Sequence, residues 1–399
     1  MRIELPCREE CSACGACLAV CPVEAIQMKE SDDGFQYPAI QEDKCVHCGK
    51  CIQVCTLRLT EEKHTPLEAY AAVGRCDSLI KKSSSGGVFA SLAMQCINEG
   101  GLVSGAVMDR DGKSVQVYHM LADCAEGIVR MQGSKYVQSD AWKCYKEIIL
   151  AVRQGKQVLF SGTPCQVSAV KRLTGDPDNL ITIDIICHGV PSLRMLNDHV
   201  EILNRRFRGK ISQVVFRDKS SRKNFCARID VERRNRLKQL YIRAHYLSYY
   251  QYFLEGTIYR DSCYRCPYAC VERISDITIG DYWGIEKHHS EALAKRNTTE
   301  KTDWSCILTN TPKGKAFLSK YGEMLEMYPS KAIYVAEQNQ QLNAPSNMPV
   351  EREEIMRLYR EKGYSAIERE FIRRSGGRVR YLWRLYKDMR RNGLFGKTI

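Results

Sequence analysis

Apolar residues along the chain form short continuous runs separated by segments of helical period. Four of these runs predict buried strands, at residues 69–74, 102–108, 157–160 and 180–186. Helical periodicity lies between and after them. Strands that alternate with helices pair in parallel, and continuous apolar strands are covered on both faces. The pattern therefore predicts an α/β domain with a largely parallel or mixed sheet.

Outside this region the pattern is less regular. Residues 27–40 predict a strand or hairpin with a turn at Asp33 and Gly34, and residues 211–217 and 225–232 predict further strands. Residues 237–255 are rich in tyrosine. We expect these tyrosines in the core, with an aromatic wall beside a ring-shaped ligand as the alternative.

From Met348 onward the chain is polar and is predicted to be helical. Near its end, one face of the predicted helix is apolar, with Val379, Leu382, Trp383, Tyr386 and Met389, and basic residues crowd the remainder. A basic amphipathic helix can pack on its own domain, lie on an anionic membrane or bind a partner. Packing on its own domain is the first expectation, and a peripheral membrane or partner contact is the second.

Composition narrows the class of protein. The 399 residues are 44% hydrophobic, which predicts a globular chain of two or three domains. No stretch has the roughly 18 apolar residues of a spanning helix, and the start lacks the apolar core of a signal peptide. Twenty cysteines in such a chain favour a reducing cytoplasm over a disulfide framework.

The net charge of +13 gathers at residues 205–210, at residues 217–238 and in the tail from Arg369. No nucleic-acid motif accompanies this charge, so we expect no nucleic acid as partner. A solvated face, or a docking surface for an acidic redox partner, explains the basic patches better.

Two cysteine runs of identical spacing dominate the first 58 residues, CSACGACLAVC and CVHCGKCIQVC. This is the ligand spacing of a bacterial-type ferredoxin with two 4Fe–4S clusters, in which the fourth cysteine of each run binds the other cluster. A pair of zinc sites fits less well, because zinc prefers two CxxC pairs and neither run stops at two cysteines. The predicted ligand sets are Cys11, Cys14, Cys17 and Cys55 for one cluster, and Cys45, Cys48, Cys51 and Cys21 for the other.

Further cysteines accompany the predicted strands of the second domain. Cys165 and Cys187 each follow a strand, and neighbouring strands would bring both to the carboxyl edge where open α/β sheets build their sites. The pair Cys263 and Cys266 precedes a predicted strand at residues 277–279. These four thiols could hold a third cluster or a zinc ion, and the CxxC pair alone could be a redox-active dithiol.

A turn of serine and glycine at residues 83–87 precedes a predicted helix. Free N–H groups at a helix start can bind a phosphate or pyrophosphate, although a plain helix cap explains the same residues. A second loop of small residues, QGSKY, begins at Gln132.

Five segments in order carry a family resemblance: SSSGGVFASL, QGSKY, FSGTPCQ, CHGVPS and CYRCPYACVERISDITIGDYWG. They resemble the beta subunit of the coenzyme F420 hydrogenase and dehydrogenase family, in the bacterial form fused to an N-terminal ferredoxin domain. The resemblance covers about residues 1–345. It implies FAD, and a 4Fe–4S cluster on Cys165, Cys187, Cys263 and Cys266, with Cys270 as a possible alternative ligand. By the same resemblance, flavin contacts would fall on Ser85, Gly86, Gly87, Gly133, Ser134, Lys135, Tyr136 and Gly280.

The expected organisation is an α+β ferredoxin-like cluster domain at residues 1–58, a linker at 59–68, a flavin- and iron–sulfur-binding α/β catalytic domain at 69–345 and a basic helical tail at 346–399. We expect an iron–sulfur flavoprotein oxidoreductase that passes electrons between ferredoxin or another redox protein, three 4Fe–4S clusters and FAD, with an organic substrate at the end. Lys135, His188 and Asp281 are the candidates to supply a proton or steer an anionic substrate. The alternative is an electron-relay or docking subunit of a larger redox complex, without substrate chemistry of its own.

Overall fold

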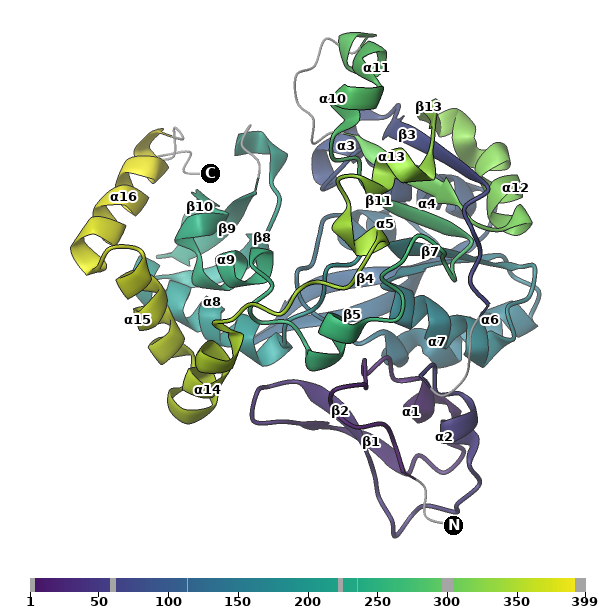
Figure 1. Ribbon diagram of the computed structural model, residues 1–399, viewed down its shortest axis with the longest axis horizontal. Helices are drawn as coiled ribbons and strands as arrows, with labels where there is room; N and C mark the ends of the chain where they lie inside the picture. Colours follow the sequence, from purple (N-terminus) through teal and green to yellow (C-terminus); the bar gives the residue numbers. More distant parts are fainter. Residues whose placement is uncertain are drawn as a thin grey trace.

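The computed structural model describes residues 4–57, 62–112, 114–221, 225–234, 236–295 and 304–391. Part of the predicted linker and the last eight residues of the predicted tail lie outside these ranges. The N-terminal part is a small body of two short helices and a hairpin, at the bottom of Figure 1. Strands β1 (Ile26–Glu30) and β2 (Gln36–Ile40) pair antiparallel, so the predicted hairpin is confirmed.

The two cysteine runs of this body fold alike. Helices α1 (Ala16–Val20) and α2 (Lys50–Gln53) each start after a glycine, Gly15 or Gly49, whose φ is 81° or 74°. This left-handed conformation is readily adopted only by glycine. It explains the glycine that both runs share, because each helix must begin immediately after a tight cysteine-bearing turn.

A mixed eight-stranded sheet forms the centre of the larger body, and this confirms the predicted fold class. Its order is β13-β3-β12-β11-β7-β6-β4-β5, and β4, β6, β7 and β11 run parallel to their neighbours in that group. All the strands predicted for this region form, whereas β5, β12 and β13 were not predicted. The strands are β3 (Glu68–Gly74), β4 (Leu102–Asp111), β5 (Ser114–Ala122), β6 (Val158–Gly162), β7 (Leu180–Ile185), β11 (Ile277–Asp281), β12 (Ser305–Thr309) and β13 (Leu325–Ser330).

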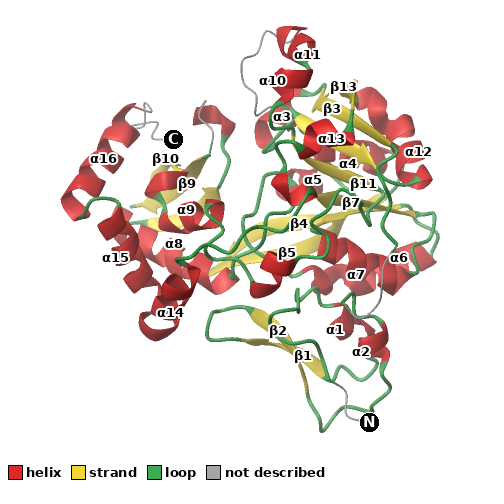
Figure 2. Ribbon diagram, viewed as in Figure 1, coloured by secondary structure: helices red, strands yellow, loops and turns green. Residues whose placement is uncertain are grey.

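Helices cover both faces of this sheet, as Figure 2 shows. Alternate residues of β6 enter two different cores: Leu159 packs in the core that holds α4 and α12, while Val158 and Phe160 pack in the core that holds α6 and α7. This two-sided burial explains why the central strands are continuously apolar. The helices of this body are α3 (Asp77–Lys82), α4 (Val88–Asn98), α5 (Ala125–Met131), α6 (Tyr145–Arg153), α7 (Pro164–Thr174), α10 (Ile285–His288), α11 (Ser290–Lys295), α12 (Pro312–Tyr321) and α13 (Ala332–Ala336).

A second, antiparallel sheet of three strands lies beside the first body, on the left of Figure 1. The tyrosine-rich segment supplies one of its strands and then a helix, and Tyr249, Tyr250 and Tyr252 are buried in the core there, as expected. Its elements are β8 (Lys210–Val215), β9 (Cys226–Arg233), β10 (Arg236–Arg243), α8 (Leu193–Phe207), α9 (Ser248–Leu254), α14 (Arg352–Lys362), α15 (Tyr364–Arg374) and α16 (Arg378–Arg391).

The tail helix α16 packs on this core, but through a different face from the predicted one. Tyr381, Leu385 and Met389 are buried, and the Tyr381 hydroxyl donates to the Tyr246 carbonyl oxygen. The predicted stripe is exposed at Val379, Leu382, Trp383 and Tyr386, so that part of the prediction is wrong. Of its members, Met389 alone is buried. Among the described residues, no helix is long and apolar enough to cross a membrane.

Candidate functional site

The outermost cysteine set lies at the surface of the N-terminal body. Cys21, Cys45, Cys48 and Cys51 line one small pocket, together with aliphatic residues that include Val23 and Val46. Cys48 is exposed. The pocket combines three cysteines of the second run with the last cysteine of the first run, which is the crossed grouping that the spacing predicts.

The second set is more enclosed. Cys11, Cys14, Cys17 and Cys55 lie near one another, and each like charge in the set makes ionisation of its neighbours less favourable. Burial is the larger effect, and it raises the pKa of Cys11 and Cys14 to about 11. Buried thiolates of this kind require a positively charged partner, which the iron of a cluster supplies.

The third set forms where two parallel strands end. Gly162 of β6 lies opposite Asp184 of β7, so Cys165 and Cys187, each three residues farther along the chain and beyond the strand end, meet at one edge of the sheet. Cys263 and Cys266 approach from the loop before β11. All four thiols line one pocket, although they come from three separate segments of the chain: Cys165, Cys187, Cys263 and Cys266.

The four thiols of this pocket suit a metal centre better than a reactive dithiol. A reactive dithiol needs a lowered thiol pKa, whereas burial raises the pKa of Cys263 to about 12. A four-iron cluster or a zinc ion would each supply the positive charge that buried thiolates require.

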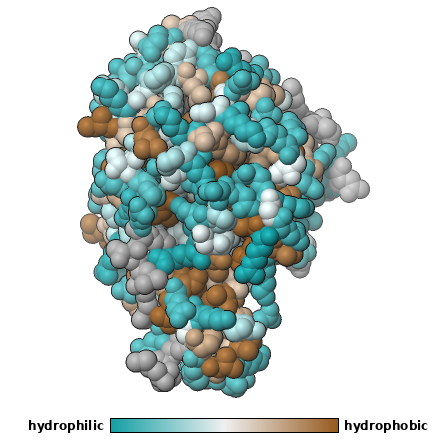
Figure 3. All heavy atoms as spheres, turned by 90° about the vertical axis from the view of Figure 1, so that its right-hand side faces the viewer, coloured by the Kyte–Doolittle hydropathy of each residue, from teal (hydrophilic) through white to brown (hydrophobic). Residues whose placement is uncertain are grey.

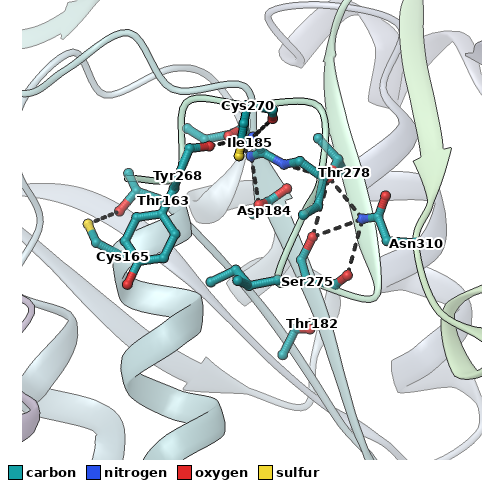
Figure 4. A network of polar contacts seen from close by, with 12 residues as sticks. Thr163, Cys165, Thr182, Asp184, Ile185, Tyr268, Cys270, Ser275, Thr278 and Asn310 are labelled. Atoms are coloured by element: carbon teal, nitrogen blue, oxygen red, sulfur yellow. Dashed lines mark hydrogen bonds and ion pairs between the residues drawn. The ribbon is translucent and has the colours of Figure 1, made fainter. Parts of the chain in front are cut away.

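Cys270 belongs to a different set of contacts. Its Sγ lies 3.1 Å from the Glu272 carbonyl oxygen and 3.4 Å from the Lys63 ammonium nitrogen, and it is absent from the lining of the thiol pocket. Figure 4 shows Cys270 near the end of β7, apart from Cys165. Cys266 is therefore better placed than Cys270 to be the fourth ligand.

A buried ion pair fixes the loop that carries Cys266. The Arg273 guanidinium donates to Asp184 of β7 at 2.7 Å and to the Tyr268 carbonyl oxygen at 2.9 Å. Figure 4 shows the hydrogen-bond network that continues from Thr278 through Asn310 to Ser275. Burial raises the pKa of Asp184, and the charge of Arg273 opposes that rise.

Arg260 joins the N-terminal body to the third cysteine set. The whole residue is 1% exposed, and its guanidinium lies over the Phe35 and Tyr37 rings and donates to Gln138. Its Nη1 is buried without a hydrogen-bond partner among the described residues, and Arg260 lines the thiol pocket.

The charge of Arg260 acts on both neighbouring cysteine sets. Burial raises the pKa of Cys11 and Cys165 to about 11, and the guanidinium of Arg260 opposes the rise at both thiols. The two sets are also neighbours in their own right, because the charge of Cys165 adds to the effect of burial in raising the pKa of Cys14. No sequence pattern singled out this arginine, since its partners are 122 to 225 residues away along the chain.

A cavity of about 520 Å³ opens at the carboxyl ends of the parallel strands, on the other side of Cys165 and Cys187. Ser161 and Gly162 of β6, Ile185 of β7 and Gly280 of β11 are part of its wall. Every residue that the sequence assigns to the flavin lines this cavity except Gly86, whose N–H donates to the Ser305 hydroxyl. The sequence-assigned residues that line it are Ser85, Gly87, Gly133, Ser134, Lys135, Tyr136 and Gly280.

Two loops of small residues close one side of the cavity and are tied together. Ser84 accepts hydrogen bonds from the backbone N–H and the hydroxyl of Ser134, at 2.7 and 2.9 Å. Helix α4 starts after Gly87, so the free N–H groups of its first turn lie beside this wall. Such N–H groups favour a phosphate or pyrophosphate.

The cavity wall also carries buried acceptors without hydrogen-bond partners among the described residues. They are His119 Nδ1, Gln132 Oε1 and Asp281 Oδ1. FAD offers donors of its own at the N3–H of the flavin ring, the ribityl hydroxyls and the adenine amine. The unpaired acceptors, the helix start and the size of the cavity together fit FAD.

The three candidate catalytic residues all line the cavity, but they differ in their contacts and exposure. The Lys135 ammonium donates to the Met131 and Gln132 carbonyl oxygens at the end of α5, at 2.7 and 2.8 Å, so it is anchored to the wall. Burial lowers its pKa to about 7, and the charge of Asp109 opposes that shift. Asp281 forms an ion pair with Arg217 at 2.5 Å. The His188 side chain is exposed to the cavity.

Two further cavity residues escaped the sequence reasoning. Arg217 lies beside the stacked Phe225 and Trp283 rings, at 5.6 and 5.7 Å from their centres, and this contact depends on the second sheet. His119, on the unpredicted strand β5, is neutral because burial lowers its pKa to about 4. Its Nε2 lies 3.0 Å from the Ser161 carbonyl oxygen, so the Nε2–H donates there and Nδ1 is left as an acceptor.

Comparison with known protein families finds three matches along the chain. Two of them are models of the coenzyme F420 hydrogenase/dehydrogenase beta subunit: the model of its N-terminal part matches residues 69–145, and the model of its C-terminal part matches residues 155–331. A 4Fe-4S dicluster domain matches residues 10–58. The N-terminal body therefore holds two 4Fe–4S clusters.

Individual relatives are more distant. An uncharacterized protein of Methanocaldococcus jannaschii is 26% identical in an alignment of length 198 that covers 43% of this chain and 54% of the relative, so the chain spans about half the length of that relative. Among solved structures, a chain of the F420-reducing [NiFe] hydrogenase complex from Methanosarcina barkeri matches 73% of this chain and 99% of its own length, with 17% identity and a TM-score of 0.45.

Proposed function

Since the chain belongs to the coenzyme F420 hydrogenase/dehydrogenase beta subunit family and carries a 4Fe–4S dicluster domain, we propose that it is an FAD-dependent iron–sulfur oxidoreductase. In this proposal, ferredoxin or another redox protein exchanges electrons with the two N-terminal clusters. A third 4Fe–4S cluster is bound by Cys165, Cys187, Cys263 and Cys266. The final electron donor or acceptor is an organic substrate in the large cavity.

One observation carries the proposal. Cys165 and Cys187 line both the thiol pocket and the large cavity, so a group bound by these thiols would be adjacent to a molecule in the cavity. Cys165 is also close to the N-terminal body. The Ser12 hydroxyl lies within hydrogen-bonding range of the Cys165 thiol, and Ser12 follows Cys11, a member of the more enclosed cysteine set. This continuity from the surface to the cavity is what electron transfer requires.

FAD, when bound, would exchange a hydride with an organic molecule and single electrons with iron–sulfur centres. The residues of the chain would hold it and exclude water. Ser84, Gly133 and Ser134 would hold the pyrophosphate beside the start of α4, while His119 Nδ1 and Gln132 Oε1 would accept hydrogen bonds from the cofactor. Asp281 and Arg217 would orient the substrate at the opposite wall, and His188 is the side chain free to move a proton.

The electron-donating partner would dock over the surface cysteine set. Cys48 is exposed there, and Val23 and Val46 are 40% and 59% exposed beside it. Figure 3 shows a mostly hydrophilic face on which apolar atoms gather at the lower end, where the N-terminal body lies. A short approach between cofactors and a small apolar contact suit a transient redox partner.

The test of this proposal is the cofactor content of the protein prepared without oxygen. We expect about twelve iron atoms, from three four-iron clusters, and about one FAD per chain. Cys165→Ser and Cys266→Ser should each lose about four irons, because each removes one ligand of the third cluster only. Metal analysis and the flavin spectrum of the denatured protein provide both numbers.

Matched controls separate the third cluster from general damage. Cys124→Ser changes an exposed thiol outside all three sets and should keep all the iron. Cys270→Ser should also keep it, because Cys270 does not line the thiol pocket. Full iron content in Cys165→Ser, or loss of iron in Cys270→Ser but not in Cys266→Ser, would contradict the ligand set. Absence of FAD from a protein with all its iron would favour the relay alternative.

A further inference from the structure

The outer face of α16 carries an exposed apolar stripe on a firmly held helix. Val379, Leu382, Trp383 and Tyr386 are 85%, 42%, 59% and 51% exposed. They fall at i, i+3, i+4 and i+7, so they lie along one side of the helix. The buried side of α16 holds the helix in place, as described above. The stripe therefore faces solvent, because the opposite side of the helix is packed against the core.

Basic side chains flank the stripe on both sides. Arg378, Arg380, Arg384 and Lys387 are exposed, and the Lys387 ammonium lies 4.7 Å from the centre of the Trp383 ring. Tryptophan and tyrosine between arginine and lysine are typical of helices that lie in the interface of an anionic membrane. The apolar rings enter the acyl boundary, and the cations remain among the headgroups.

A pocket next to the stripe has the chemistry of a phosphate site. It has a volume of about 380 Å³ and shares Trp383, Arg384 and Lys387 with the outer face of α16. On its other side, Arg243 lines it, and the Arg243 Nε is buried without a hydrogen-bond partner among the described residues. Asp388 is the single carboxylate of the lining, and it is paired with Arg243. The remaining donors favour an anionic group.

We propose that α16 docks the protein on an anionic phospholipid bilayer, with the stripe in the interface and a lipid phosphate in the adjoining pocket. A second copy of this chain is a poorer occupant, because pairing two α16 faces would bring two sets of arginine and lysine together. Figure 1 shows α16 at the left edge of the molecule, away from the N-terminal body at the bottom. Docking through α16 thus leaves Cys48 and the surface cysteine set open to a redox partner.

The full-length protein should sediment with vesicles of phosphatidylglycerol and phosphatidylcholine, and it should not sediment with vesicles of phosphatidylcholine alone. Trp383→Glu should weaken this binding by about tenfold or more, because it places a carboxylate in the interface. Arg380→Glu with Arg384→Glu should weaken it as well, and the binding of the wild type should fall with added salt. Leu150→Glu is the matched control: Leu150 is 58% exposed on α6, and this variant should bind like the wild type.

Three results would overturn the proposal. One is the absence of binding to anionic vesicles. Another is equal loss of binding in Leu150→Glu and Trp383→Glu. The third is self-association of the wild type in analytical ultracentrifugation that Trp383→Glu abolishes, since this would assign the stripe to a second copy. Inorganic phosphate provides a further distinction: tryptophan quenching by phosphate without vesicle binding would assign the pocket to a free anion. Iron content, which should be unchanged in every variant, reports that the chain is folded.

Discussion

Gly133 offers a test of the flavin cavity with little disturbance of the fold. Its φ is 81°, and a Cβ built there meets only the Lys82 carbonyl oxygen, at 3.8 Å. Asparagine and aspartate tolerate this left-handed conformation better than other residues with side chains. A side chain at this position would therefore reach the cavity at a modest conformational cost.

We expect Gly133→Asp to lower the affinity for FAD by about tenfold or more, because its carboxylate would approach the pyrophosphate. Gly133→Asn has nearly the same shape and no charge, so it should keep most of the flavin. Titration of the flavin-free protein with FAD, followed by fluorescence quenching, measures both affinities. Equal affinities in the two variants would place the pyrophosphate elsewhere.

Arg260 should tune the reduction potential of the proposed third cluster. Its guanidinium is buried beside Cys165 and Cys263, and a positive charge there stabilises the more negative reduced form. We expect Arg260→Gln to shift the midpoint potential of that cluster to lower values, and Arg260→Lys to shift it less. Redox titration followed by electron paramagnetic resonance measures the shift.

The iron content of the Arg260 variants decides how that result is interpreted. A variant that retains all its iron but shows an unchanged midpoint would assign Arg260 a packing role between the two bodies. Loss of the third cluster in Arg260→Gln, with retention in Arg260→Lys, would show that the charge is needed to hold the thiolates together.

At the scale of elements, the sequence predicted the strands correctly where a continuous apolar run was the dominant local pattern. Strands β6 and β7 are continuously apolar because helices cover both faces, and this pattern can be read without partners. Strand β5 was missed: polar and apolar residues alternate strictly only over its first four positions, 114–117, and the strand lies at the edge of the sheet. Strands β12 and β13 return from the far end of the chain to pair around β3, and no local pattern announces that pairing.

Helix α16 illustrates a different limit. Its apolar residues divide between two faces, and periodicity cannot decide which face meets the core. Tyr381 and Leu385 face the core. This orientation is favoured because the Tyr381 hydroxyl donates to the Tyr246 carbonyl oxygen and accepts from the Arg206 guanidinium. Polar contacts from distant segments thus determined the orientation of the helix, and they left the more prominent stripe outside.

At the scale of the whole molecule, the three cysteine sets form a sequence in space from the surface to the cavity. The surface set is exposed at Cys48, and the inner set follows with Cys14. The Cys14 carbonyl oxygen accepts a hydrogen bond from the Tyr145 hydroxyl of the larger body. Cys165 comes next, with the cavity behind it. This order predicts that electrons from a protein partner reach the flavin only through the surface cluster.

Cys21→Ser should therefore abolish flavin reduction by reduced ferredoxin, because it removes a ligand of the surface cluster. Reduction of the same flavin by dithionite, a small reductant that enters the cavity directly, should persist. Stopped-flow absorbance of the flavin measures both rates, with Cys124→Ser as the control that keeps both. Normal reduction of Cys21→Ser by ferredoxin would place the entrance at another cysteine set.

The amino-acid sequence by itself determined that this protein carries a 4Fe–4S dicluster domain. Cysteine spacing predicted the crossed ligand sets, because a turn of three thiolates is a local property of the chain, and the apolar runs predicted the central strands. Only the tertiary structure decided which residues lie between the three cysteine sets and the cavity. The buried Arg260, the Asp184–Arg273 pair and the unpaired acceptor on His119 join segments far apart in the chain. Their effect depends on low dielectric surroundings that exist only once the sheets and helices have packed.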